Sequence, residues 1–168
     1  MTACGAPDEP VAVGSEMPSF KLPMRDGSKL VGESLAGAPA VISFWATWCQ
    51  PCLKDIPELN ELVARDGLAV FAVALDEEGW GVIDPFLEQR PLRATVLLGN
   101  EDVFRRFGGF TIPYTMVVDG KGIIRAIFRG PVTRRQVLDS LELPSRVGEP
   151  VESLSLLSTE ETRAHPSS

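Results

Sequence analysis

The chain has 168 residues, of which 44% are hydrophobic and 23% charged, with a formal net charge of −7 and a pI near 4.8. This length predicts one domain with a hydrophobic core. The negative charge argues against a nucleic-acid partner, whose phosphates would be repelled, and no apolar run reaches the length of about 18 residues that spans a bilayer. Only three cysteines are present, so the chain is not a disulfide-stapled scaffold.

The N-terminal stretch has no periodic pattern, and we expect residues 1–14 to form a flexible leader. Thr2 and Ala3 before Cys4 resemble the end of a bacterial lipoprotein signal, in which the cysteine becomes a lipid anchor, but the charged and apolar regions expected upstream are missing. Two interpretations stay open. Either Cys4 is lipidated on a chain that begins partway through such a signal, or it is an incidental residue.

The first half of the domain is expected to contain a hairpin and a βαβ unit. Short extended pieces at 17–22 and around Leu30 flank the turn dipeptide Asp26-Gly27. Apolar strands are predicted at 40–46 and 68–75, separated by a helix at about 50–65. Two buried strands joined by a helix form a right-handed unit with parallel strands.

The second half predicts further alternation of helices and strands. A helix is expected at 84–90 with Pro85 in its first turn, then a strand at 95–98 and a helix at 101–107. Strands at 114–118 and 123–128 form a hairpin, and Thr133 caps a last helix that ends near 143. The domain therefore covers 15–144, an α/β fold with a central mixed sheet flanked by helices. Residues 145–168 are polar and are expected to be disordered.

The most informative motif is a pair of thiols at the junction of a predicted strand and helix, in the run Trp48-Cys49-Gln50-Pro51-Cys52. The N-terminus of the helix would stabilise a thiolate, so the pKa of the Cys49 thiol should fall below the free value of about 8.5. Cys49 is expected to be exposed, and Cys52 shielded one turn inside. The implied cycle is attack by Cys49 on a partner disulfide and resolution of the mixed disulfide by Cys52.

Two other uses of this motif compete with redox chemistry. Half a zinc site would need further ligands, and the candidates Cys4 and His165 lie at opposite ends of the chain. A docking or metallochaperone domain that holds a metal such as copper also stays open. Redox chemistry is favoured, and it predicts no cofactor beyond the redox-active disulfide and no metal.

The segment 44–52 resembles the active-site segment of the thioredoxin superfamily, in the wording Phe-Trp-Ala-Thr-Trp-Cys-x-Pro-Cys of its extracytoplasmic TlpA and ResA-like branch (redoxin or AhpC-TSA-like domains). The resemblance covers roughly residues 14–143. Residues 17–20 resemble the extra N-terminal hairpin of that branch, Pro57 the proline that kinks the active-site helix, and Ile112-Pro113 the cis-proline. The resemblance implies a thioredoxin fold with an N-terminal β-hairpin and a central αβ insertion.

The resemblance also implies roles for residues around the thiols. A cis bond before Pro113 would lie beside Cys49, and Ile112 would pair with an extended partner peptide. Thioredoxins carry a buried Asp where this chain has Ser43. Asp55 matches a position at which ResA-like members have a Glu, so it either relays protons for Cys52 or is a solvated surface acid.

The predicted function is a thiol–disulfide oxidoreductase acting on protein disulfides. Gln50 and Pro51 supply no positive charge that would hold a thiolate in a strongly oxidising way, and Ile112 before the candidate cis-proline resembles the thioredoxin side, so we expect a reductant. Trp48 is expected to pack beside the thiols. The resemblance implies an extracytoplasmic location, periplasmic or membrane-anchored, a membrane-borne thiol reductant, and apocytochrome c or an assembly factor as partner. A peroxiredoxin-type peroxidase is the second enzyme class, although its Pro-x-x-x-Thr segment does not precede Cys49.

Overall fold

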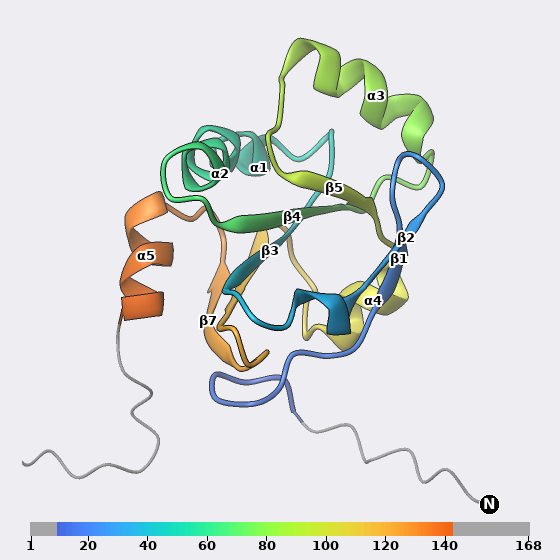
Figure 1. The fold of residues 1–168 in the computed structure, drawn as a ribbon. Coiled ribbons are helices and arrows are strands. Elements are labelled where there is room, and N and C mark those ends of the chain that lie inside the picture. The colour runs from blue at the N-terminus through green and yellow to red at the C-terminus, as the bar shows by residue number, and fades with distance from the viewer. Residues whose placement is uncertain (1–9, 143–168) are drawn as a thin grey trace, which may run out of the picture.

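The computed structural model of the protein describes residues 10–142 (Figure 1). Cys4, the polar tail at 145–168 and most of the predicted leader lie outside these residues. At the end of the leader, Val11 packs against the core, and the Gly14 N–H donates to the Ile124 carbonyl oxygen at 2.8 Å. The last leader residues are therefore held against the domain.

The centre of the molecule is a mixed sheet with the strand order β5-β4-β3-β6-β7. Its strands are β3 (Ala40–Trp45), β4 (Ala69–Ala74), β5 (Thr95–Leu98), β6 (Tyr114–Val118) and β7 (Ile124–Arg129). The strands β3, β4 and β5 run parallel, whereas β6 is antiparallel to β3 and β7 to β6. The predicted mixed sheet, the βαβ unit and the late hairpin are confirmed.

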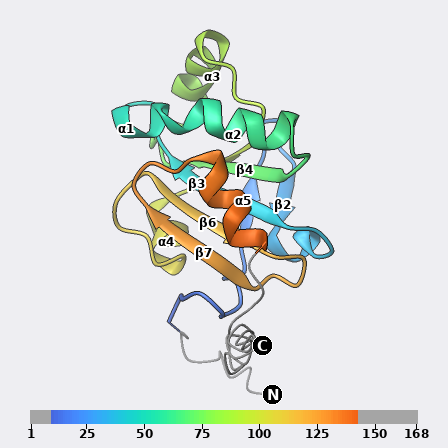
Figure 2. The same ribbon diagram turned by 90° about the vertical axis from the view of Figure 1, so that its left-hand side faces the viewer.

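Helices cover both faces of this sheet, so alternate residues of the central strand enter two different cores. Val41 of β3 belongs to a core shared with α2 (Asp55–Ala64), α3 (Trp80–Gln89) and α5 (Arg134–Glu142). Ile42 belongs to the opposite core, which includes residues of α4 (Glu101–Arg106). Figure 2 shows α2 and α5 on the side nearer the viewer. Every residue of β3 is buried, as its continuous apolar sequence predicts.

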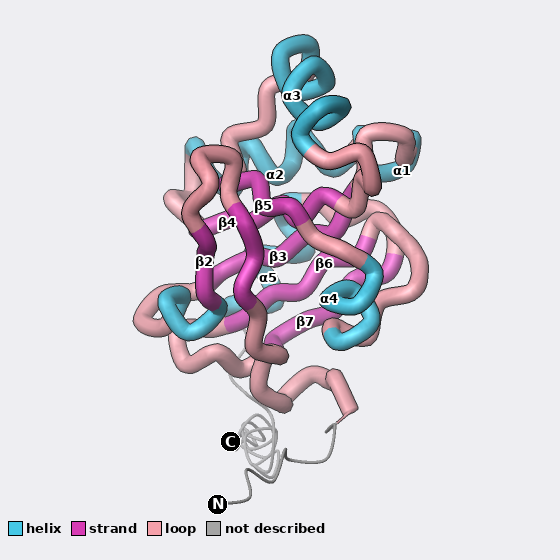
Figure 3. The backbone as a smooth tube through the Cα atoms, turned by 90° about the vertical axis from the view of Figure 1, so that its right-hand side faces the viewer, coloured by secondary structure: helices cyan, strands magenta, loops and turns pink. Residues whose placement is uncertain are grey.

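The N-terminal hairpin pairs β1 (Lys21–Pro23) with β2 (Lys29–Val31) in antiparallel register. Gly27 has a φ of +85°, which the tight turn after Asp26 requires. The hairpin lies on the α4 side of the sheet, away from α5 (Figure 3), and Met24 forms a single β-bridge with Leu97 of β5. The predicted hairpin is confirmed, and α3 with β5 forms the central insertion. A short 3₁₀ helix, η1 (Gly32–Leu35), was not predicted.

Two predicted helices differ from the structure, and a proline lies in both. The helix expected at 50–65 is divided at Lys54 into α1 (Gln50–Leu53) and α2, because Pro57 has no N–H to donate to the Leu53 carbonyl. The prediction that Pro85 lies in a first turn is wrong, since α3 begins at Trp80. The carbonyl that Pro85 leaves unbonded belongs to Gly81, which is exposed and can bind water.

The last helix docks where the sequence predicts it. Thr133 and Gln136 form a capping box, in which the Gln136 N–H donates to Thr133 Oγ1 and the Thr133 N–H donates to Gln136 Oε1, at 3.3 and 2.9 Å. Arg134 fixes the helix to the end of α2 through an ion pair with Asp66, with a distance of 2.6 Å from Nη2 to Oδ1. In the part of the chain from 10 to 142, no helix has the length and apolar character to cross a membrane.

Candidate active site

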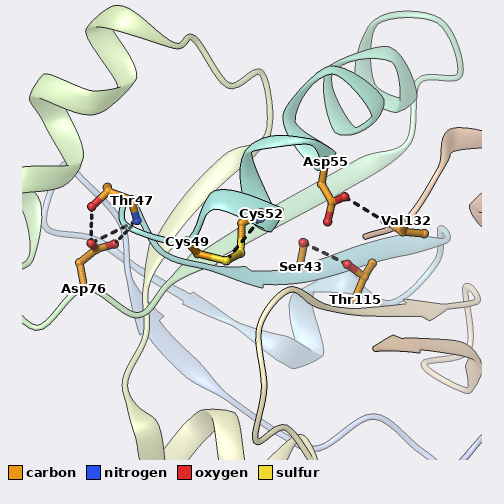
Figure 4. Close-up of a disulfide and its surroundings, with 8 residues drawn as sticks. All are labelled: Ser43, Thr47, Cys49, Cys52, Asp55, Asp76, Thr115 and Val132. Atoms are coloured by element: carbon orange, nitrogen blue, oxygen red, sulfur yellow. Dashed lines mark hydrogen bonds between the residues drawn. A yellow bond between two sulfur atoms is a disulfide. The ribbon is translucent and has the colours of Figure 1, made fainter. Parts of the chain in front are cut away.

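Cys49 and Cys52 are joined by a disulfide at the start of α1 (Figure 4). The Cys52 N–H donates to Cys49 Sγ at 3.3 Å, so Cys49 caps the helix, and the Cys49 N–H donates to the Ala46 carbonyl at 3.1 Å. Pro51 lies in the first turn, where a missing N–H leaves no bond unmade. The local sequence therefore ends β3, turns the chain once and presents both sulfurs together.

The sulfur pair is less accessible than the sequence suggested. Cys49 is 4% exposed and Cys52 is 2% exposed, so the prediction of an exposed Cys49 is wrong for this oxidised structure. Both belong to the core on the α2 side, against which Ile112 packs. Trp48 was expected to pack beside the thiols but is 67% exposed, while Gln50 and Pro51 are also exposed. A partner protein can therefore contact Trp48 directly, whereas the side chains that cover Cys49 must move before the partner reaches its sulfur.

The Ile112-Pro113 peptide bond is cis, as the family resemblance predicts. Ile112 is half-buried and Pro113 is buried. The Pro113 carbonyl accepts a hydrogen bond from the Gly130 N–H at 2.9 Å, which connects this loop to the end of β7. The cis-proline loop, residues 109–113, thus lies against the same core as the two cysteines.

A groove of about 870 Å³ extends from the active-site loop to α4. Trp48 lines one part of it, Phe110 and Ile112 of the cis-proline loop another, and Asp76 and Glu77 a third. Phe110 is 78% exposed. Large exposed aromatic side chains around a hollow are typical of interaction sites. Phe110 was not singled out in the sequence, where its only signal is an aromatic residue between a Gly pair and the Ile-Pro step.

Asp55 is buried at the first turn of α2, at 3% exposure, and so is not a solvated surface acid. Its Oδ1 accepts a hydrogen bond from the Val132 N–H at 3.0 Å, whereas Oδ2 has no partner among the residues described. Burial raises the pKa of Asp55 from 3.8 to about 6; the Val132 hydrogen bond opposes this shift and the Glu58 carboxylate adds to it. A carboxyl group with this pKa can exchange protons near neutral pH.

Two hydroxyl groups lie below the disulfide and Asp55 (Figure 4). The Oγ atom of Ser43 on β3 and the Oγ1 atom of Thr115 on β6 are 3.1 Å apart, and both residues are buried. Ser43 occupies the position of the buried thioredoxin Asp and cannot act as a base at neutral pH. Asp55 is therefore the titratable group that Figure 4 places on this side of the disulfide.

A second buried carboxylate lies on the other side of the disulfide (Figure 4). Asp76 follows β4 and is 2% exposed, and its two oxygens accept from the Thr47 N–H at 3.2 and 3.1 Å. Sequence reasoning missed this pair. The available signal was an Asp at the carboxyl end of a buried parallel strand, where polar groups of α/β proteins gather.

Among residues 10–142, no group of three or more His, Cys, Asp or Glu side chains is arranged to hold a metal ion. The other zinc ligands considered from the sequence, Cys4 and His165, fall outside this range.

Comparison with known proteins places the chain in a family. The profile of the AhpC/TSA family matches residues 13–127. The chain belongs to the AhpC/TSA family. This AhpC/TSA protein is 30% identical over 136 residues to the thiol-disulfide oxidoreductase ResA of Geobacillus thermodenitrificans, an alignment that covers 79% of this chain and 78% of the relative. It is 28% identical over 134 residues to the thioredoxin-like protein YneN of Bacillus subtilis, covering 77% and 79%.

Solved structures agree with these relatives. The structure of a DsbE thiol:disulfide interchange protein from Chlorobium tepidum has a TM-score of 0.71 and 27% sequence identity, and the alignment covers 79% of this chain and 99% of that one. The predicted thioredoxin fold and the ResA-like resemblance are confirmed. This AhpC/TSA protein is a thiol–disulfide oxidoreductase with a Cys49–Cys52 disulfide.

Proposed function

We propose that this enzyme reduces disulfides of partner proteins by exchange at Cys49 and Cys52. The observation that carries the proposal is the disulfide at the start of α1, beside a groove walled by Trp48 and the cis-proline loop. A thiol pair at a helix N-terminus supplies the nucleophile, and the groove supplies room for a polypeptide segment.

The proposed cycle begins with the reduced pair. The Cys49 thiolate attacks one partner sulfur, and the other partner sulfur leaves as a thiolate and takes up a proton. Cys52 then loses its proton to Asp55 and attacks Cys49 Sγ, which closes the disulfide and releases the second partner thiolate. Two electrons have passed to the partner, and an external thiol reductant must return two electrons to the pair.

The partner is proposed to dock as an extended chain. The backbone of Ile112 precedes the cis-proline and would pair with the partner in the manner of an added strand. The exposed rings of Trp48 and Phe110 would contact apolar side chains of the same segment. Affinity would then come from backbone pairing, with side-chain preference set by the groove.

The direction of exchange is proposed to be reduction. Gln50 and Pro51 between the cysteines carry no positive charge that would stabilise the reduced pair. We expect a reduction potential below about −200 mV, in contrast to about −120 mV for the strongly oxidising members of the superfamily. Equilibration of the purified protein with reduced and oxidised dithiothreitol measures this value. A potential near the oxidising limit would overturn the direction and leave the exchange chemistry standing.

The setting is proposed from the similarity to ResA. An extracytoplasmic enzyme of this type would reduce apocytochrome c or an assembly factor and receive electrons from a membrane-borne thiol reductant. Lipidation at Cys4 would hold the domain at the membrane surface. The partner and the reductant are tested by identifying the proteins that form mixed disulfides with the enzyme, and lipidation is tested by mass spectrometry of the N-terminal peptide that contains Cys4.

Trapping of mixed disulfides is the decisive experiment. A Cys52→Ala variant cannot resolve the intermediate, so we expect it to accumulate covalent adducts with partner proteins in the source cell, seen on non-reducing gels and identified by mass spectrometry. The Cys49→Ala variant lacks the nucleophile and should form none. Adducts of equal amount in both variants would show that Cys49 is not the attacking residue.

A peroxidase is the second candidate, because peroxiredoxins share this fold and a similar N-terminal region. The segment before Cys49 lacks the Pro-x-x-x-Thr pattern of a peroxidatic cysteine. Consumption of hydrogen peroxide by the reduced protein, compared with reduction of insulin, separates the two activities.

A further inference from the structure

Asp76 is a buried carboxylate whose side chain bonds to one residue, Thr47, among the residues described. The Thr47 N–H donates to both carboxylate oxygens, and the Thr47 hydroxyl lies 2.5 Å from Oδ1. Asp76 is 2% exposed and takes part in none of the ion pairs formed within residues 10–142. A single residue thus provides the hydrogen bonds of the whole carboxylate.

Thr47 lies in the turn that presents Cys49. This turn is closed by the hydrogen bond from the Cys49 N–H to the Ala46 carbonyl, and Thr47 is its first central residue. The Thr47 N–H points out of the turn and is free to reach Asp76. Leu75 immediately precedes Asp76, and its N–H donates to the Trp45 carbonyl at 2.9 Å. This hydrogen bond is the last one between the parallel strands β3 and β4. Asp76 therefore continues the connection between β4 and β3 into the active-site loop.

The contact is poorly explained by stability alone. Burying a carboxylate without a cation costs free energy, and the three contacts with Thr47 are the only side-chain hydrogen bonds that offset this cost among the residues described. The charge lies against the backbone two residues before the nucleophile. Figure 4 shows the Thr47–Asp76 pair on one side of the disulfide and Asp55 on the other.

We propose that Asp76 is a positioning residue that fixes the Cys49 turn through Thr47 and, by its charge, lowers the reduction potential of the Cys49–Cys52 pair. Reduction converts a neutral disulfide into a pair in which Cys49 carries the negative charge of a thiolate. A fixed carboxylate nearby destabilises that charge and leaves the disulfide unaffected. The oxidised form is favoured, so the reduced protein is a stronger electron donor.

The inference rests on the proposed function, since it concerns the same pair, but it is tested without a partner protein. One molecule of dithiothreitol loses two electrons and two protons and closes to its cyclic disulfide. The Cys49–Cys52 disulfide takes up the two electrons and one proton, which gives a Cys49 thiolate and a Cys52 thiol, and the second proton passes to the solvent. Failure of the wild-type protein to equilibrate with dithiothreitol would count against the proposed function. Normal equilibration of the wild type with no effect of Asp76 would count against this inference alone.

The test compares Asp76→Asn with Glu78→Gln at pH 8. Each variant removes one negative charge from the same loop, but Glu78 is exposed. For Asp76→Asn we expect the equilibrium constant for reduction by dithiothreitol to rise threefold to tenfold, which corresponds to a potential higher by up to about 30 mV. For Glu78→Gln we expect a constant within twofold of the wild-type value.

Variants of Thr47 separate charge from loop geometry. Thr47→Val keeps the Asp76 carboxylate but removes the hydroxyl that donates to it, so the negative charge is less well compensated. We therefore expect the equilibrium constant for reduction by dithiothreitol to fall at least threefold. Thr47→Ser keeps the hydroxyl, and its constant should remain within twofold of the wild-type value. A rise in both Thr47→Val and Asp76→Asn would indicate simple loosening of the loop and overturn the charge argument. If Asp76→Asn does not fold, the two Thr47 variants still test the inference. Equal equilibrium constants for Thr47→Val, Thr47→Ser and the wild type would overturn it.

Discussion

Asp55 enters the protein interior without a cation, since none of the ion pairs within residues 10–142 includes it. Burial disfavours its charged form and raises the pKa from 3.8 to about 6, and the neighbouring Glu58 carboxylate acts in the same direction. The folded protein therefore holds a proton on Asp55 at pH values where the unfolded chain has lost it.

The sign of the effect on stability follows from this difference. Between pH 4 and 6 the folded state binds more protons at Asp55 than the unfolded state, so the free energy of unfolding falls as the pH rises through this range. A shift of roughly two units corresponds to a loss of about 2 kcal/mol between pH 4 and pH 7.5. In Asp55→Asn this loss should be absent, as measured by urea unfolding at the two pH values.

Exposed Glu88 on α3 offers the control, since Glu88→Gln should keep the pH dependence of the wild type. The same Asp55→Asn protein should reduce insulin more slowly above pH 6, because Cys52 loses its proton acceptor. A pH–rate profile identical to the wild type would remove Asp55 from the proposed cycle.

Residues of the site differ in how far the sequence could predict them. Cys49, Cys52 and Pro113 belong to short motifs whose chemistry is local or carried by the family resemblance. Asp76 and Thr47 are separated by 29 positions, and their contact exists only because β3 and β4 are parallel neighbours that end together. The burial of Asp55 likewise depends on Val132, 77 positions away. Such pairs require the tertiary fold.

At the scale of elements, the cis-proline loop packs closely against α4 at Gly109. A Cβ atom added at Gly109 would overlap the ring of Phe104, a core residue of α4. The loop can approach the helix closely only because this side chain is absent. Gly109 therefore sets the position of Ile112 and of one wall of the groove.

Gly109→Ala should force the loop and the helix apart. Overpacking of this kind costs typically about 1–3 kcal/mol, and we expect lower stability in denaturant together with slower reduction of insulin. Gly81→Ala in α3 is the matched control, since its added Cβ meets open space and an alanine is preferred in a helix by up to about 1 kcal/mol. Equal stability of the two variants would contradict the close packing at Gly109.

The ends of strands that lie between turn residues were predicted correctly. The strands at 95–98 and 114–118 agree with the structure to the residue, because short apolar runs lie between turn residues. A proline is common in the first turn of a helix, so Pro85 predicts a start at 84, whereas α3 begins at Trp80; Trp80 and Ile83 extend the apolar pattern before the proline. The short η1 carries no periodic pattern that could predict it.

At the scale of the whole molecule, the sequence indicated the class of fold but not the arrangement of strands. Continuous apolar strands, one helix between the first two and a final hairpin favour a mixed sheet with both faces covered. That β3 lies at the centre and β5 at an edge follows from pairings between distant segments. The sequence predicted a mixed sheet but no order for its strands.

The N-terminal segment contacts both edge strands of this sheet. Glu16 forms a β-bridge with Ile123 next to β7, the Ile124 N–H donates to the Ser15 carbonyl, and Met24 bridges Leu97 on β5. Unpaired edge strands are templates for aggregation, and the proline that ends β1 adds no donor of its own. Residues 14–31 thus occupy backbone groups at one end of β7 and on β5, which leaves fewer edge groups for a second chain to pair with.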